Sequence, residues 1–420
     1  MNAGSNTTTA ESLFKPLTLS NVRLRNRLIR AATYEGCADS AGTPGSELGE
    51  IYRHLAEGGV GAIITGFVYV SQSGRAMQPR QCGIDKDEKI DAWHKVIDQT
   101  KNDHPDLPLF MQLAHAGRQT RREITGMPVH GASDRKCGYF RQKVHSLDDG
   151  GIKAIIDQFA EASMRAKRAG FDGIQIHAAH GYLIHQFLSP WTNMRKDRWV
   201  DGPLLLEEII RSVRAKNGSE FPILVKLSWG EDHNPGIDIE NTLNTVKRLE
   251  ALNIDAVEIS YGSMEYALNI MRGGCPVDVF LNVNPLFRHI PRAMHGLWKK
   301  LFSGSYLGKF IPFEENYNFE AARRIRSNTA LSVIPVGGIR NLAGINRCLE
   351  NDLSAVSLCR PLICEPDLPI QIKSGRQSSS KCVNCNLCTA YCDSHKSLRC
   401  YRKKEIKRED SGRPGRDKGI

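Results

Sequence analysis

The sequence lacks the features that would insert the chain into a membrane or direct it out of the cell. No apolar run in its 420 residues approaches the roughly 18 residues that a membrane span requires. The two longest candidates, residues 60–70 and 331–339, are interrupted by Gly, Thr, Ser or Pro. The first residues, MNAGSNTTTAES, show no basic segment followed by an apolar one, so no secretory signal is predicted. We therefore expect a cytoplasmic protein without membrane partners.

Stretches of one charge sign are also scarce. The formal charge is +11, and the residues from Tyr401 onward, with eight Lys or Arg against four Asp or Glu, supply +4 of it. No stripe of Lys and Arg is interleaved with aromatic residues, which argues against a nucleic-acid partner. The basic end is expected to be solvated and flexible. Charged residues at 25% and hydrophobic residues at 40% are ordinary for a globular chain and exclude collagen and wholesale disorder.

Short β-branched runs alternate with amphipathic segments along most of the chain. Eight runs are candidate strands, at residues 28–33, 62–70, 109–114, 173–177, 223–228, 256–260, 332–337 and 355–358. They are almost continuously apolar, as in a parallel sheet that is buried on both faces. Segments with helical spacing lie between them, at 46–57, 151–169, 204–215, 240–252, 319–327 and 343–350. Eight strand–helix units predict an α/β fold of the (β/α)8 TIM-barrel type.

The alternative fold is a doubly wound sheet. It would normally have fewer strands and a glycine fingerprint at the first turn, and no such fingerprint follows Thr33. Residues 264–316 are rich in Gly, Pro and aromatic residues and break the rhythm after the sixth strand. We expect a barrel over residues 1–372 with an insertion at about 264–316, and a cysteine-rich tail over residues 373–420.

Polar residues at the carboxyl ends of the predicted strands are candidates for the active site of such a barrel. The fourth strand ends at His177, and His180 and Tyr182 follow it, which puts two imidazoles and a phenol in one loop. The third strand carries Gln112 and the fifth carries Lys226. A buried ammonium group needs an anion or access to the barrel mouth, so Lys226 either faces a ligand or pairs with a neighbouring carboxylate. A histidine at a strand end can likewise be purely structural.

The loops after strands seven and eight are the usual phosphate site of this fold. Gly337 and Gly338 follow the seventh strand, where glycines let backbone N–H groups approach an anion. Arg360 follows the eighth strand and would supply the charge. Glycines also occur in any tight turn, so the interpretation of this loop as a phosphate site depends on its position in the barrel.

Five of the twelve cysteines crowd into one stretch near the end of the chain. They are Cys382, Cys385, Cys388, Cys392 and Cys400, with the pattern C-x₂-C-x₂-C-x₃-C and eleven residues between Cys388 and Cys400. A disulfide framework is not expected in a long chain without a secretory signal. Thiolates at this spacing can converge on a soft metal centre, either an iron–sulfur cluster or a structural Zn²⁺.

Several motifs together indicate a family. They are LFKPL at residues 13–17 with Asn26 and Arg27, HAAHGYL at 177–183, FLSP at 187–190 and NMRKD at 193–197. Over residues 13–372 the chain resembles the Old Yellow Enzyme-like NADH:flavin oxidoreductases, in particular the branch with 2,4-dienoyl-CoA reductase and trimethylamine dehydrogenase. The resemblance implies an FMN-dependent oxidoreductase of the ene-reductase type. It would take hydride from NAD(P)H and reduce an activated, α,β-unsaturated small-molecule substrate.

The resemblance also implies roles for individual residues. His177 and His180 would bind the substrate carbonyl oxygen, and Tyr182 would deliver the proton. The residues expected along the flavin ring are Ala31, Ala32, Thr33, Gly66 and Gln112, with Lys226 at its N1–O2 edge and Gly337, Gly338 and Arg360 at the phosphate.

The 2,4-dienoyl-CoA reductase branch carries a [4Fe–4S] cluster just after its barrel, on a similar cysteine run. The resemblance implies Cys382, Cys385 and Cys388 as ligands, with Cys400 or Cys392 as the fourth; we predict Cys400. A cluster would exchange electrons with a partner protein, and a homo-oligomer is compatible with the sequence.

Two other functions stay open at this point. An amine demethylase or dehydrogenase of the trimethylamine dehydrogenase type would use the same flavin and could build a substrate bowl from the aromatic residues of 264–316. A non-enzymatic flavin- or metal-binding regulator is the third hypothesis.

Overall fold

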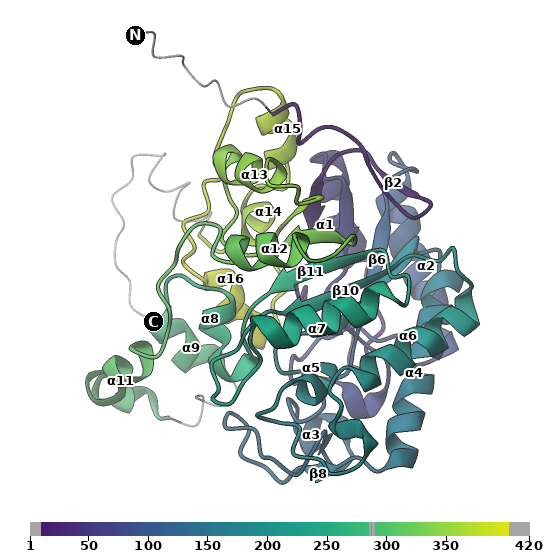
Figure 1. Ribbon diagram of the computed structural model, residues 1–420. Coiled ribbons are helices and arrows are strands. Elements are labelled where there is room, and N and C mark those ends of the chain that lie inside the picture. The colour runs from purple at the N-terminus through teal and green to yellow at the C-terminus, as the bar shows by residue number, and fades with distance from the viewer. Residues whose placement is uncertain (1–9, 285–286, 288–289, 403–420) are drawn as a thin grey trace.

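Eight parallel strands form a ring at the centre of the structure, a computed structural model that describes residues 10–284, 287 and 290–402 (Figure 1). Neighbouring strands follow the order β12–β11–β10–β9–β6–β4–β3–β13, and a parallel bridge between Val336 and Ser357 joins its two ends. The strands are β3 (Leu28–Arg30), β4 (Ala62–Ile64), β6 (Leu109–Ala114), β9 (Gly173–Ala178), β10 (Ile223–Ser228), β11 (Ala256–Ser260), β12 (Ser332–Pro335) and β13 (Val356–Leu358). The predicted (β/α)8 barrel is confirmed.

Helices cover the outside of this ring. Six coincide closely with the predicted segments: α1 (Ser46–Glu57), α4 (Asp149–Arg168), α6 (Leu204–Asn217), α7 (Ile239–Glu250), α12 (Phe319–Arg326) and α13 (Leu342–Leu349). A seventh, α2 (Ile90–Lys101), follows β4 and is missing from the prediction; it buries Trp93, Val96 and Ile97. Asp238 begins α7 by accepting a hydrogen bond from the N–H of Asn241, whose side chain accepts in return from the Asp238 N–H. Such a capping box satisfies backbone donors that have no partner within the helix.

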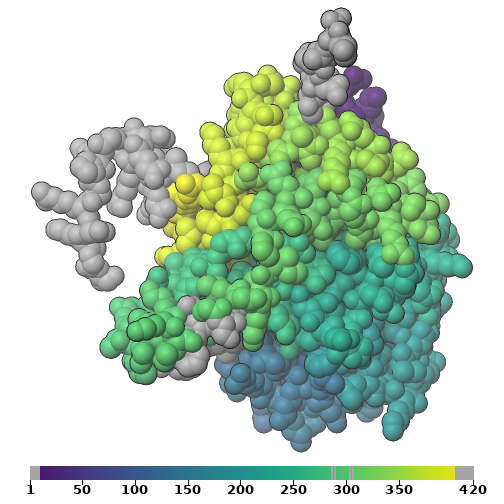
Figure 2. All heavy atoms as spheres, turned by 60° about the vertical axis from the view of Figure 1, so that its left-hand side comes forward, coloured from purple at the N-terminus to yellow at the C-terminus, as the bar shows by residue number. Residues whose placement is uncertain are grey.

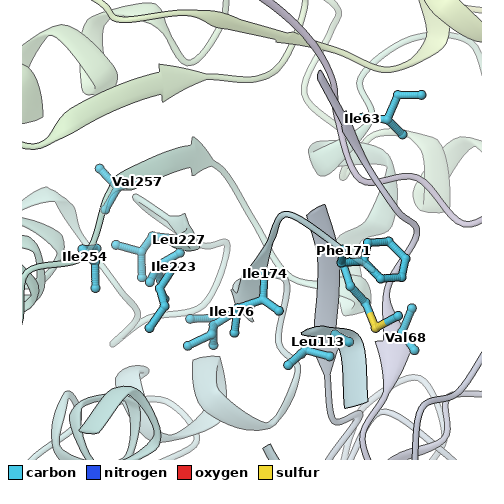
Figure 3. Close-up of a cluster of buried hydrophobic side chains, with 14 of the residues drawn as sticks. Ile63, Val68, Leu113, Phe171, Ile174, Ile176, Ile223, Leu227, Ile254 and Val257 are labelled. Carbon is cyan, nitrogen blue, oxygen red and sulfur yellow. The ribbon is translucent and has the colours of Figure 1, made fainter. Parts of the chain in front are cut away.

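The strands place alternate side chains in two cores. Ile63, Leu113 and Ile223 belong to the outer core, which they share with residues of the surrounding helices (Figure 3). Ile64 and Leu224, their neighbours along the chain, belong to a second cluster inside the ring. This alternation follows from the two-residue period of a strand. Burying one such side chain contributes roughly 1.5–3 kcal/mol.

An N-terminal hairpin closes one end of the barrel. It consists of β1 (Leu17–Leu19) and β2 (Val22–Leu24), which pair antiparallel. Leu19 and Leu24 belong to the inner cluster together with Ala62 and Ala256, the first residues of β4 and β11. Because the hairpin seals the amino ends of the strands, the carboxyl ends are left for a functional site.

Residues 264–316 form a helical excursion after β11. It contains α8 (Ala267–Ile270), α9 (Val277–Val283), α10 (His295–Trp298) and α11 (Gly304–Leu307). The part around α11 projects from the body of the molecule (Figures 1 and 2). The tail returns to this excursion, because α16 (Leu387–Ala390) and the turn η7 (Tyr391–Asp393) both pack against α9.

The remaining elements are short. They are β5 (Val68–Tyr69), β7 (His130–Gly131), β8 (His145–Ser146), α3 (Arg122–Thr125), α5 (Leu183–Leu188), α14 (Arg360–Cys364) and α15 (Leu368–Lys373). None of the helices in the described ranges combines the length and apolarity of a membrane span. Residues 1–9 and the predicted flexible basic end, residues 403–420, lie outside the described residues.

Candidate active site

A large cavity lies at the carboxyl ends of the barrel strands. Eleven of the twelve predicted catalytic and cofactor residues line it: Ala31, Ala32, Thr33, Gln112, His177, His180, Tyr182, Lys226, Gly337, Gly338 and Arg360. The twelfth, Gly66, packs behind this wall. Its N–H donates to Oε1 of Glu35 at 2.9 Å, and a Cβ atom at Gly66 would lie 2.6 Å from the Thr33 carbonyl oxygen. Only glycine therefore fits at this position.

The loop after β9 brings two imidazoles and a phenol together. The ring centroid of His177 lies 5.1 Å from the ring centroid of His180 and 5.0 Å from that of Tyr182. Both pairs pack edge to face. Tyr182 also stacks on Phe67 at 5.3 Å. His180 takes a left-handed backbone conformation with φ of 62°, and its Nε2 lies 2.8 Å from Ser260 Oγ. The sequence motif thus forms one cluster in the cavity wall.

Burial fixes the protonation states in this cluster. It lowers the pKa of His177 and of His180 well below the ordinary value, and the charge of Lys226 adds to the effect. Both imidazoles are therefore neutral near pH 7. Burial raises the pKa of Tyr182, so the phenol keeps its proton. Nδ1 of His177 accepts a hydrogen bond from the N–H of Ala179 at 3.3 Å, which assigns the proton of this ring to Nε2.

Lys226 both faces the cavity and pairs with a neighbouring carboxylate, the two alternatives that its sequence position allowed. It lines the cavity, and its Nζ also lies 3.0 Å from Oε2 of the buried Glu258. The same Oε2 accepts from Nε2 of Gln175 at 3.0 Å, and Oε1 of Gln175 accepts from Nε2 of Gln112 at 2.6 Å. A polar chain thus crosses four neighbouring strands beneath the cavity. The carboxylate of Glu258 therefore compensates the positive charge of the buried Lys226 side chain.

Sequence reasoning missed Glu258 and Gln175. The available signal was the polar residue inside an otherwise apolar strand, the same signal that singled out Lys226. The strand register then pairs Lys226 with Glu258 and Gln112 with Gln175.

The predicted phosphate loop has the conformation that its glycines permit. Gly337 and Gly338 have φ of 126° and 72°, which side chains rarely adopt. Nη1 of Arg360 donates to the Arg272 carbonyl at 2.8 Å and to Oδ1 of Asn386 at 2.6 Å. Arg360 therefore joins the barrel to the tail as well as lining the cavity.

The cavity wall contains buried polar groups without a hydrogen-bond partner. Within the described part of the chain, Oγ of Ser357 and Nε2 of Gln119 are buried without a hydrogen-bond partner, and both residues line the cavity. Leaving such groups unsatisfied costs about 1–3 kcal/mol each. Ser357 pairs across the sheet with Val336, directly before Gly337. The wall therefore fits a bound group with acceptors along it, as a flavin mononucleotide has.

A second, smaller cavity adjoins the first and is lined by thiols. The four predicted ligands Cys382, Cys385, Cys388 and Cys400 all line it, together with Cys364 of α14. Cys392 lines the first cavity instead, and its Sγ donates to the Cys388 carbonyl at 3.3 Å. Arg360 and Cys388 line both cavities, so the two share a wall.

The thiols do not form a site for a single ion as they stand. Across residues 10–284, 287 and 290–402, no three His, Cys, Asp or Glu side chains are placed to hold a metal ion. The donor set around the second cavity is nevertheless that of a soft metal centre, with five thiols and no carboxylate. Cys364 lies outside the cysteine-rich stretch of the sequence, and only the fold brings it to this group.

The insertion, whose aromatic residues were candidates for a substrate bowl, and the tail both add residues to the cavity wall. Phe280, Asn284, Phe287 and Trp298 come from the insertion, and Asp393 comes from the tail. For Asn284 and Asp393 the sequence offered no local signal, because the position of each depends on how a distant segment folds back onto the barrel.

The sequence of this chain is similar to a known protein family and to several of its members. Residues 12–274 match the model of the NADH:flavin oxidoreductase / NADH oxidase family. The chain is 28% identical to an NADH oxidase of Thermoanaerobacter brockii over 386 residues, which cover 90% of this chain and 53% of that protein. It therefore spans about half the length of that relative. It is 32% identical to an NADPH dehydrogenase of Bacillus subtilis (strain 168) over 275 residues, 63% of this chain and 78% of the other.

A solved structure shows the same fold. The old yellow enzyme homologue from Zymomonas mobilis matches with a TM-score of 0.68 and 23% identity over 91% of this chain and 99% of its own.

Proposed function

The chain belongs to the NADH:flavin oxidoreductase / NADH oxidase family, and from this premise we propose that it is an FMN-dependent enzyme that uses NAD(P)H to reduce an activated, α,β-unsaturated alkene. The observation that carries the proposal is the cluster of His177, His180 and Tyr182 in one cavity wall. Two neutral imidazoles and a protonated phenol are the groups needed to bind a carbonyl oxygen and to protonate the neighbouring carbon.

The proposed FMN site uses residues from several strands. Ala31, Ala32, Thr33, Gln112 and Lys226 would flank the ring, with Gly66 supporting Thr33 from behind; Gly337, Gly338 and Arg360 would hold the phosphate. When bound, FMN accepts hydride from NAD(P)H and gives it to the β-carbon of the substrate. The ammonium of Lys226 would stabilise negative charge on the ring edge.

The protein groups then have separate tasks. Nε2–H of His177, with His180 beside it, would donate to the substrate oxygen and draw electron density from the double bond. The Tyr182 hydroxyl would give its proton to the α-carbon. Because His177 and Tyr182 are buried and His180 is half-buried, these hydrogen bonds would form largely away from water, where they are stronger.

The cysteine-lined cavity supports a [4Fe–4S] cluster as a second cofactor. Cys382, Cys385 and Cys388 would be three of its ligands, and the position of Cys400 favours it over Cys392 as the fourth. Since the two cavities share a wall, the cluster would pass single electrons between the flavin site and a partner protein. Structural Zn²⁺ is the alternative for the same thiols.

An amine dehydrogenase remains the second candidate function. It is favoured by Phe280, Phe287 and Trp298, since these insertion residues line the cavity and aromatic faces attract alkylammonium groups.

Half-reactions of the purified protein test the proposal. NAD(P)H should bleach the flavin absorption of the FMN-loaded protein without oxygen, and 2-cyclohexenone should then restore it. Bleaching by trimethylamine or another alkylamine, with no recovery on adding the enone, would instead establish the second candidate. Release of FAD rather than FMN on denaturation would overturn the cofactor assignment.

A further inference from the structure

The insertion and the tail meet in the wall of the active-site cavity at Asp393. This residue ends the turn η7, and it lines the cavity with Asn284 and Tyr139. Nδ2 of Asn284, just after α9, donates to Oδ2 of Asp393 at 2.6 Å and to the Tyr139 hydroxyl at 3.0 Å. The loop after β6, the insertion and the tail therefore meet at one hydrogen-bonded group, in which Asn284 joins Tyr139 to the Asp393 carboxyl group.

Asp393 differs from the other carboxylate in the cavity wall. Glu265 forms ion pairs with Arg118 and with His233. No lysine, arginine or histidine of the described residues pairs with Asp393, and Asn284 is its hydrogen-bond donor. Desolvation raises the pKa of Asp393 to about 7. A desolvated carboxylate without a counter-charge is costly, and a cationic ligand would remove this cost.

The surroundings of Asp393 suit an organic cation. Tyr139, Phe280, Phe287 and Trp298 line the same cavity and come from the same segments, and the rings of Phe287 and Trp298 lie 5.7 Å apart. Aromatic faces attract cations, most strongly where water is excluded. The charge of Asp393 also reaches the catalytic cluster, since it contributes to the raised pKa of Tyr182. Asp393 and the catalytic cluster also line the same cavity.

We propose that Asp393 is a specificity-determining residue that binds a protonated amine of the substrate. The oxygen of the substrate would bind at His177 and His180, and its cation would bind at Asp393 between the aromatic rings. The preferred substrates would then be activated alkenes that carry a basic nitrogen, rather than neutral ones. This inference rests on the proposed function and narrows its substrate class.

The inference can be tested by comparing the affinities of two ligands that have similar shapes and differ in charge. Phenols mimic the substrate oxygen, so tyramine and 4-ethylphenol would occupy the same site and differ in one ammonium group. At about pH 8 the amine is protonated and Asp393 is ionised. Tyramine should perturb the flavin absorption of the FMN-loaded protein at about 10- to 100-fold lower concentration than 4-ethylphenol, as expected for one charge-assisted hydrogen bond. Asp393→Asn should abolish this difference.

A matched control uses a carboxylate of the same insertion. Asp278 lies on α9, is exposed, and pairs with Lys299; Asp278→Asn should keep the preference for tyramine. Equal affinity of the wild-type protein for both phenols would overturn the inference. So would a preference that survives in Asp393→Asn, because the cation would then bind elsewhere.

Turnover separates failure of the inference from failure of the proposed function. Reduced protein should be reoxidised by 2-cyclohexenone, and more efficiently by 4-(aminomethyl)cyclohex-2-enone, with the advantage lost in Asp393→Asn. Reoxidation by both enones with equal kcat/KM would overturn the role of Asp393 and leave the proposed function standing. Reoxidation by neither enone would overturn the proposed function and this inference with it.

Discussion

Tyr182 can be tested as the proton donor by a single-atom change. Its ring packs against the rings of His177 and Phe67, and Tyr182→Phe keeps these contacts. We expect the reduction of FMN by NAD(P)H to be unchanged, while reoxidation by an enone slows by about 10²- to 10⁴-fold, the usual contribution of general acid catalysis. Anaerobic stopped-flow measurement of the two half-reactions gives both rates. Equal slowing of both would mean that the hydroxyl has only a structural role.

The preference for a cationic ligand should depend on pH. Since its pKa is raised to about 7, Asp393 carries a charge above this pH and loses it below. Three titratable groups on which its charge acts, Tyr34, Tyr182 and Cys392, have pKa values raised by burial and stay neutral across the range. The ratio of the affinities for tyramine and 4-ethylphenol should therefore fall between about pH 8 and about pH 5.5. In Asp393→Asn the ratio should be constant, and a constant ratio in the wild type would contradict the assignment.

At the scale of residues, the sequence was most informative where chemistry and strand position coincide. His177, His180 and Tyr182 are adjacent in the chain, so a short motif was enough to bring them together. Glu258 belongs to the same polar layer as Lys226, but its partner lies on the next strand and only the register identifies it. No sequence pattern identified Asp393 as a site residue, because its position in the cavity depends on the tail packing against α9.

At the scale of elements, the capping box of α7 allows a quantitative test. The Asp238 side chain accepts from the N–H of Asn241 at 2.9 Å, and it lies at the surface, away from the cavity. Asp238→Ala should lower the free energy of unfolding by about 0.5–2 kcal/mol, measured by urea denaturation. FMN binding should not change. Asp238→Ser restores an acceptor at the same position and should recover most of the loss; a loss as large as that of alanine would show that the cap does not stabilise the helix.

Periodicity predicted the repeating elements and failed for the irregular ones. All eight barrel strands were recognised because burial on both faces makes them continuously apolar. Helix α2 was missed, although it buries Trp93, Val96 and Ile97 on one face, because its short apolar face lies among polar and charged residues. The helices α8 and α9 of the insertion are only four and seven residues long, and a π-helical segment, Lys299–Ser303, interrupts the α-helical period between α10 and α11.

At the scale of the whole molecule, the tail forms part of the site rather than a separate appendage. Asn386 accepts from Arg360 and donates to the carbonyl groups of Met271 and Gly274, so one side chain joins tail, barrel and insertion. The sequence predicted a cysteine-rich segment after the barrel and could not show where it packs. Its position beside Arg360 is what makes the flavin cavity and the thiol-lined cavity neighbours.

This arrangement predicts which thiol would complete the proposed metal centre. Cys400 lines the second cavity with Cys382, Cys385 and Cys388, whereas Cys392 lines the first. Protein prepared without oxygen should contain about four irons per chain with matching sulfide. Cys400→Ser should lose iron, and Cys392→Ser should retain it. Both variants should still bind FMN, because the residues proposed to bind it belong to the barrel.

The fifth thiol of the second cavity, Cys364, is an alternative fourth ligand if Cys400→Ser retains its iron. Cys364 is the last residue of α14, which begins at Arg360, and its thiol hydrogen-bonds with that of Cys400. If Cys400→Ser kept its iron and Cys364→Ser lost it, the barrel rather than the tail would provide the fourth ligand. Stoichiometric zinc without sulfide would reject the electron relay altogether. The thiols would then fasten the tail to the barrel, and all electrons would have to reach the flavin directly from NAD(P)H.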